Sequence, residues 1–126
     1  MIRIPDKGRF ELRLMDGSVN PYLLQASVLA AGLYGLKNKI DPGKPLNCNM
    51  YEDHAKYPDL PKLPNELVQS LEQLKNNKEM NEAFGKETIM SYIKLRSLEI
   101  REFQSKESFD KTKPISKWEK DNTLDC

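Results

Sequence analysis

The chain has 126 residues, which suffices for one domain or for part of one. With 38% hydrophobic and 31% charged residues, its composition is that of a folded chain and excludes a wholly disordered one. Its 20 basic and 19 acidic side chains leave a formal net charge of +1, so charge gives no reason to expect nucleic acid or an acidic membrane as a partner.

No secretory signal is expected at the start, because the first residues are polar and include Arg3, Lys7 and Arg9. The two cysteines, Cys48 and Cys126, stand far apart and show neither a disulfide framework nor metal-binding spacing. We therefore expect two reduced thiols in a cytoplasmic protein.

Residues 8–15 alternate between polar and apolar side chains, which predicts a strand with one polar and one apolar face. Arg9, Glu11 and Arg13 share the polar face. No other strand is predicted, and a lone strand cannot satisfy its own backbone groups. We therefore expect this strand to pair with a strand that the sequence does not contain.

A helix is predicted from Pro21 to about Ile40. Asn20 is a favoured N-cap, and proline suits the first helical position because its missing N–H is not needed there. Leucines and small residues cover most of the circumference, so we expect this helix to be buried in a larger body. It is interrupted by polar residues such as Gln25 and falls short of the roughly 20 apolar residues that a membrane span needs.

Residues 41–64 are predicted to form an irregular, largely extended connection, because prolines recur along them. A connection of this length is uncommon in a compact domain, which suggests a function or packing against another chain. The prolines of this segment are Pro42, Pro45, Pro58, Pro61 and Pro64.

Helices are predicted over most of 65–104. The first follows Pro64, a short one covers about 77–84 and stops at Gly85, and a long one runs from Lys86 to about Gln104. The tail, 105–126, is charged and carries the only tryptophan, Trp118. The predicted class is therefore α+β, mostly helical, with one strand in the N-terminal region, 1–15.

The polar face of the predicted strand could carry chemistry. A carboxylate at Glu11 can bind a divalent metal ion, and guanidiniums at Arg9 and Arg13 can hold phosphate or carboxylate groups. Arg3 and Lys7 add positive charge just upstream, as phosphoryl transfer requires. On spacing alone, a solvent-exposed ladder of ion pairs is the commoner origin of such a pattern.

The order of several motifs resembles the C-terminal part of the catalytic domain of glutamine synthetases. The motifs are "IRIP", "RFELR", "DGSVNPYL" and "AGLYGLKNKIDPG". The resemblance is close from Ile2 to about Tyr51 and looser through the later helices. The ending "WEKDNTLDC" resembles the type III, or glutamine synthetase-like, branch, which also contains ligases for γ-glutamyl amides. The single N-terminal strand would then belong to the active-site sheet of such a domain.

The resemblance implies an ATP-dependent ligase. Such enzymes phosphorylate the γ-carboxylate of glutamate, ammonia then attacks the γ-glutamyl phosphate, and two divalent cations, Mg²⁺ or Mn²⁺, assist. Glu11 matches a metal-binding glutamate, and Arg13 matches a catalytic arginine that contacts substrate glutamate and the transferring phosphoryl group. Arg3 and Arg9 match ATP-binding arginines, and Lys7 corresponds to an ATP-contacting lysine. A cytoplasmic homo-oligomer is implied as well.

Two residues of the proline-rich segment have competing interpretations. Tyr51 stands where some bacterial members carry a tyrosine that is adenylylated for regulation. The sequence after Tyr51 departs from that pattern, so an ordinary loop tyrosine is the favoured interpretation. His54, the only histidine, is predicted to be a loop residue because no ligand spacing accompanies it.

In the family, the other metal ligands and the arginine for the substrate α-carboxylate lie upstream of the matched motifs. We therefore expect residues 1–126 to be a C-terminal fragment of the catalytic domain, inactive by itself, with the N-terminal part as its partner. A fragment of a γ-glutamyl-amide ligase is an alternative, and a non-catalytic helical interaction module is another. The fragment interpretation predicts exposed apolar surface on the 20–40 helix and aggregation; the module predicts a stable, monodisperse protein.

Overall fold

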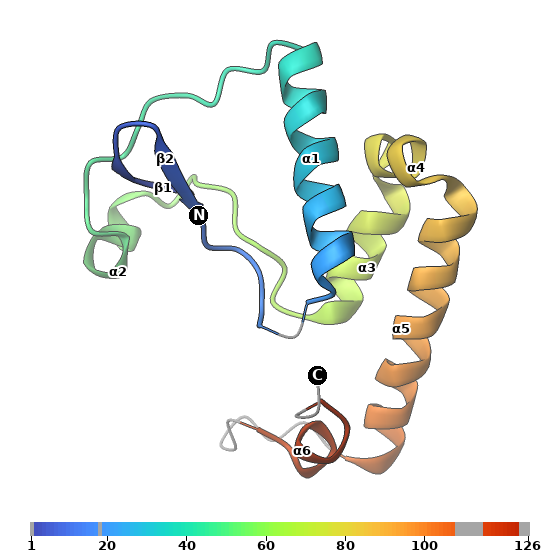
Figure 1. Ribbon diagram of the computed structural model, residues 1–126. Coiled ribbons are helices and arrows are strands. Elements are labelled where there is room, and N and C mark those ends of the chain that lie inside the picture. Colours follow the sequence, from blue (N-terminus) through green and yellow to red (C-terminus); the bar gives the residue numbers. More distant parts are fainter. Residues whose placement is uncertain (1, 18, 108–114, 124–126) are drawn as a thin grey trace.

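The computed structural model describes residues 2–17, 19–107 and 115–123 (Figure 1). It is mostly helical with one small sheet, so the predicted α+β class is confirmed. The elements in chain order are β1 (Ile2–Asp6), β2 (Arg9–Leu12), α1 (Pro21–Lys37), α2 (Met50–Asp53), the 3-10 helix η1 (His54–Lys56), α3 (Leu67–Asn76), α4 (Lys78–Phe84), α5 (Lys86–Lys106) and α6 (Lys117–Thr123).

The sheet is a two-stranded antiparallel hairpin formed by β1 and β2. The expectation of a lone strand, paired only outside this sequence, was therefore wrong. The partner immediately precedes the predicted strand and was missed because Pro5 lacks an N–H and interrupts the strand pattern. Lys7 and Gly8 make the connecting turn, where Gly8 adopts a φ of 81° that favours glycine.

The hairpin contains an irregularity in β1. Ile2 pairs with Leu12 and Arg3 with Glu11, but the next pair joins Asp6 to Arg9. Between these two pairs, β1 advances by three residues and β2 by only two. The extra residue in β1 defines a β-bulge. Pro5 lies within the bulged stretch, one of the few places where a strand tolerates proline.

Helix α1 begins as predicted. The Asn20 side chain accepts hydrogen bonds from the backbone N–H groups of Tyr22 and Leu23, at 3.0 and 3.1 Å. The helix ends at Lys37, slightly earlier than expected, and Lys39 beyond it takes a left-handed φ of 50°.

No residue of α1 is buried within the described chain. Its exposed apolar side chains include Tyr22, Leu29 and Leu36, which are 83%, 63% and 78% accessible. The expectation of exposed apolar surface on this helix is therefore confirmed, and its burial would require contact with another body. No helix among the described residues combines the length and apolarity needed to cross a bilayer.

The packed part of the molecule is small and lies between helices. Helix α3 packs on α5, and α4 contacts both α1 and α5 (Figure 1). Leu71 from α3 and Ile89 from α5 are the buried hydrophobic residues of the described chain. Between α4 and α5, Gly85 makes the sharp turn with a φ of 81°.

Two segments contain short helices that the sequence did not predict. The proline-rich 41–64 connection contains α2 and η1, with the Asn49 side chain capping α2. The tail contains α6, whose Trp118 packs edge-on against Phe103 of α5 with ring centroids 5.8 Å apart. The tail is therefore anchored to α5 by an aromatic pair.

Candidate functional site

Charged side chains gather on one side of the β1–β2 hairpin. Because side chains of a strand alternate between faces, Arg9, Glu11 and Arg13 share a side, and Arg3 joins them as the cross-strand partner of Glu11. The set that we call the charged face consists of Arg3, Asp6, Arg9, Glu11 and Arg13.

Glu11 is the centre of this face, and its two carboxylate oxygens have different surroundings. Oε2 accepts hydrogen bonds from Nη2 and Nε of Arg13, at 2.9 and 3.1 Å, and from Nη1 of Arg3 at 3.3 Å. Oε1 lies 3.9 Å from Nη2 of Arg9, beyond hydrogen-bond distance. Within the described chain, Oε1 therefore accepts no hydrogen bond.

The arginines hold Glu11 in its ionised form. The hydrogen bonds from Arg13 are the main cause that lowers the pKa of Glu11, with the bond and the charge of Arg3 adding to it. Partial burial of the carboxylate acts in the opposite direction and is outweighed. Glu11 is therefore a carboxylate at neutral pH.

Asp6 is a member of the charged face that the sequence did not indicate. Its Oδ2 accepts a hydrogen bond from Nη2 of Arg9 at 3.2 Å. A regular strand would put residues 3 and 6 on opposite faces, and the bulge removes this difference. The proline in a strand-like stretch was the available signal, because prolines inside strands mark bulges or edges.

Lys7 is the predicted site residue that the structure keeps apart from Glu11. It lies in the turn of the hairpin and makes no ion pair with the described residues. The structure therefore brings together Arg3, Arg9, Glu11 and Arg13, and leaves Lys7 in the hairpin turn, where its ammonium pairs with no carboxylate of the described residues.

The charged face suits a ligand with anionic oxygens. The three guanidiniums remain more than half exposed even though each is paired with a carboxylate. An arginine has five N–H donors, so each can bind a phosphate or carboxylate oxygen while it keeps its present partner. Solvent-exposed ladders of ion pairs have the same contacts.

Toward a divalent cation, the charged face offers one carboxylate oxygen that accepts no hydrogen bond from the described residues. Oε1 of Glu11 is free to coordinate, whereas Oε2 is occupied by two arginines. No group of three or more His, Cys, Asp or Glu side chains in the described ranges is arranged to hold a metal ion. A Mg²⁺ or Mn²⁺ ion bound here would need most of its ligands from elsewhere.

Other candidates lie outside the charged face. Tyr51 is on α2 and is 88% exposed, and His54 lies in η1 rather than in a loop. The thiol of Cys48 donates to the sulfur of Met50 at 3.5 Å. Cys126 lies outside the described residues.

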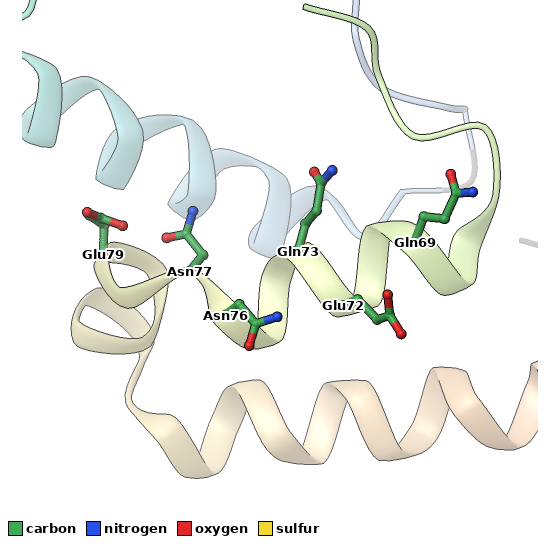
Figure 2. Close-up of a pocket in the computed structure, with 6 residues that line it drawn as sticks. All are labelled: Gln69, Glu72, Gln73, Asn76, Asn77 and Glu79. Carbon is green, nitrogen blue, oxygen red and sulfur yellow. The ribbon is translucent and has the colours of Figure 1, made fainter.

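An open groove of about 680 Å³ runs along α3 onto the start of α4 (Figure 2). Amide and carboxylate side chains line it, with no cationic group among them: Gln69, Glu72, Gln73, Asn76, Asn77 and Glu79. A hydrogen bond to the Glu79 carboxylate raises the pKa of Tyr34 on α1, so this contact links α1 to α4. The groove shares no residue with the charged face.

Comparison with known proteins gives a consistent family match. Residues 1–113 match the family model described as glutamine synthetase, catalytic domain. A glutamine synthetase of Rhizobium meliloti (strain 1021) is 44% identical over 125 residues, covering 99% of this chain. A glutamate–methylamine ligase of Methyloversatilis universalis is 35% identical over 128 residues, again covering 99% of the chain.

A solved structure shows the same relation in three dimensions. A GmaS/ADP complex superposes on the whole chain with a TM-score of 0.78 and 35% sequence identity. The chain spans about 27% of that structure, and likewise 27% of the Rhizobium meliloti and Methyloversatilis universalis relatives.

Proposed function

The chain belongs to the glutamine synthetase catalytic-domain family, and we propose that it supplies the C-terminal part of an ATP-dependent glutamate–ammonia ligase. The complete enzyme would form glutamine through γ-glutamyl phosphate. The observation that carries the proposal is the charged face, in which Arg3, Arg9 and Arg13 surround Glu11 on an exposed hairpin. Because the chain spans about 27% of its relatives, we expect it to be inactive in isolation.

The arginines would divide the anionic oxygens of the substrates among them. Arg3 and Arg9 would bind ATP phosphates, and Lys7 would add a further contact from the turn. Arg13 would contact glutamate and the transferring phosphoryl group through the N–H groups that Glu11 does not use. Fixed positive charge at this position stabilises the negative charge that develops on the phosphoryl oxygens. The similar solved structure is a complex with ADP, which supports the use of a nucleotide by the complete enzyme.

Glu11 would supply one ligand of a Mg²⁺ or Mn²⁺ ion through Oε1, with the other ligands in the part of the relatives that the chain does not span. Such an ion neutralises phosphate charge during transfer. Arg3 and Arg13 would contribute by holding the carboxylate ionised and fixed through Oε2. This leaves a single oxygen available for coordination.

A γ-glutamyl-amide ligase with an amine acceptor is the second candidate. Two findings favour it: the glutamate–methylamine ligase at 35% identity, and the GmaS complex at the same identity. The Rhizobium meliloti relative at 44% identity favours ammonia.

For the assembly, we propose that the remaining part of the catalytic domain covers α1, and that the complete enzyme is a cytoplasmic homo-oligomer. The exposed leucines of α1 support a covering partner. The same exposure would serve a non-catalytic helical module, which remains the alternative from a different functional class.

A chimera tests the proposal. The chain would replace the matching 27% of the Rhizobium meliloti glutamine synthetase, and ATP-dependent amide formation would be measured with ammonia and with methylamine. We expect activity that Glu11→Ala abolishes, because a lost metal ligand leaves the phosphate charge uncompensated. Glu66→Ala, at an exposed helix start without a side-chain cap bond, is the matched control and should retain activity.

Retained activity in Glu11→Ala would contradict the role of Glu11 in metal binding. The ratio of the ammonia rate to the methylamine rate would show which acceptor the chimera prefers. A folded chimera without activity for either acceptor would favour the non-catalytic module.

A further inference from the structure

The bulge in β1 changes which side chains reach the charged face. Glu11 and Arg9 are two residues apart in β2, so their side chains lie on the same side of the hairpin. Arg3 and Asp6 are three residues apart in β1, and in a regular strand this spacing would place their side chains on opposite sides. The extra residue in the Ile4–Pro5 stretch lets Asp6 stand opposite Arg9, on the face that carries Glu11.

Asp6 then competes with Glu11 for the same guanidinium. Nη2 of Arg9 lies 3.2 Å from Oδ2 of Asp6 but 3.9 Å from Oε1 of Glu11. Arg3 and Arg13 both bind the other oxygen of Glu11. Arg9 is thus the arginine of this face that does not hydrogen-bond to Glu11, and Asp6 is the carboxylate that it does bind.

We propose that Asp6 is a positioning residue: it holds Arg9 away from Glu11, so that Oε1 stays free and the Arg9 guanidinium stays open to an anionic ligand. This inference rests on the proposed function, in which Arg9 binds nucleotide phosphate. Without Asp6, the nearest anionic oxygen for Arg9 is Oε1 of Glu11. Arg9 would close onto it, which would occupy both oxygens of Glu11 and turn the guanidinium inward.

The positioning role predicts that removing the Asp6 charge changes anion binding in the direction opposite to that expected from electrostatic attraction alone. Neutralising a carboxylate beside an anion site should strengthen anion binding if charge alone matters. If Asp6 positions Arg9, Asp6→Asn should instead weaken binding, and only while Arg9 is present. A double-variant cycle with Arg9→Gln isolates this dependence.

The first measurement concerns geometry and needs no ligand. In the full chain, NMR would follow the side-chain Nε signal of Arg9 and the carboxylate carbon of Glu11. We expect both signals to move in Asp6→Asn and neither to move in Asp59→Asn, a matched change at an exposed aspartate of the proline-rich segment. Unchanged Arg9 and Glu11 signals in Asp6→Asn would overturn the proposal.

The second measurement uses ADP as the probe and follows its binding to the chimera with the Rhizobium meliloti enzyme by isothermal titration calorimetry, because the isolated chain carries only part of the proposed nucleotide site. We expect Asp6→Asn to weaken ADP binding about two- to fivefold, the range of an exposed ion pair, and to have no weakening effect in the Arg9→Gln background. Stronger binding in Asp6→Asn would overturn the positioning role. If ADP does not bind the unaltered chimera, the proposed nucleotide role fails, whereas the first measurement still decides whether Asp6 holds Arg9.

Discussion

Glu11 has one carboxylate oxygen bound by two arginines and one bound by none. This asymmetry follows from the order of charges along the hairpin, because Arg13 and Arg3 approach from one side while Arg9 is drawn to Asp6. A carboxylate fixed in this way keeps its charge and its orientation while leaving one coordination position open.

The lowered pKa of Glu11 predicts how the hairpin responds to acid. Its folded-state pKa lies below the unfolded value, so its stabilising contribution is present above the ordinary carboxyl range and is lost as the pH falls through the folded pKa. We expect the backbone NMR signals of β1 and β2 to lose their dispersion over that acidic range. In Glu11→Gln, most of this acid-dependent loss should be absent; an unchanged acid profile would contradict the assignment to Glu11.

At the residue scale, sequence alternation predicted most of the charged face. Arg9, Glu11 and Arg13 follow a period of two, which survives in the folded hairpin. Asp6 escaped prediction because a bulge adds one residue to the count, and the position of a bulge depends on pairing rather than on local pattern. The roles of these residues in ligand binding stay predictions.

Among the secondary structure elements, the helices were more predictable than the sheet. Capping by Asn20 and Asn77 and the stop at Gly85 are local signals, and α1, α4 and α5 begin where those signals lie. Strand β1 could not be predicted without its pairing partner β2. Helix α6 is positioned by the contact of Trp118 with Phe103. Both depend on contacts between segments, which a local pattern does not contain.

Two glycines allow a matched test of the helical part. Gly85 joins α4 to α5 with φ 81° and ψ 138°, a conformation strained for any L side chain, so Gly85→Ala should lower the free energy of unfolding by about 1 kcal/mol or more. Gly35 lies inside α1, where an added Cβ meets nothing within 4 Å. Gly35→Ala should therefore raise the stability of the isolated chain by up to about 1 kcal/mol.

Urea unfolding followed by circular dichroism measures both changes. If Gly85→Ala proves as stable as the unaltered chain, the α4–α5 junction does not have the described backbone. If Gly35→Ala is destabilising in the isolated chain, α1 has a close neighbour at that position, contrary to the open space found there.

The molecule as a whole buries little apolar surface for its length. Leu71 and Ile89 are the buried hydrophobic residues of the described chain, while large apolar side chains are exposed along α1 and in the hairpin. A chain with so small a core depends on additional contacts for much of its stability. At this scale the sequence was informative, because a helix that is apolar on most sides predicts a covering body.

Self-association of the isolated chain is therefore expected. Sedimentation velocity should show species larger than the 14.6 kDa monomer, increasing with concentration. The double variant Leu29→Gln and Leu36→Gln, which removes two exposed leucines of α1, should shift the distribution toward monomer. Lys37→Gln is the control on the same helix. A monodisperse monomer at all concentrations would contradict the fragment interpretation and support the module.

Because β1 pairs with the next strand in sequence, the charged face can form early during folding. All members of the charged face lie between residues 3 and 13, so the face needs no distant part of the chain to assemble. Hairpins close within about 1–10 μs, before segments far apart in sequence have met. A two-stranded hairpin alone is only marginally stable, so the face should form early, open often and become persistent when an anion holds its arginines together.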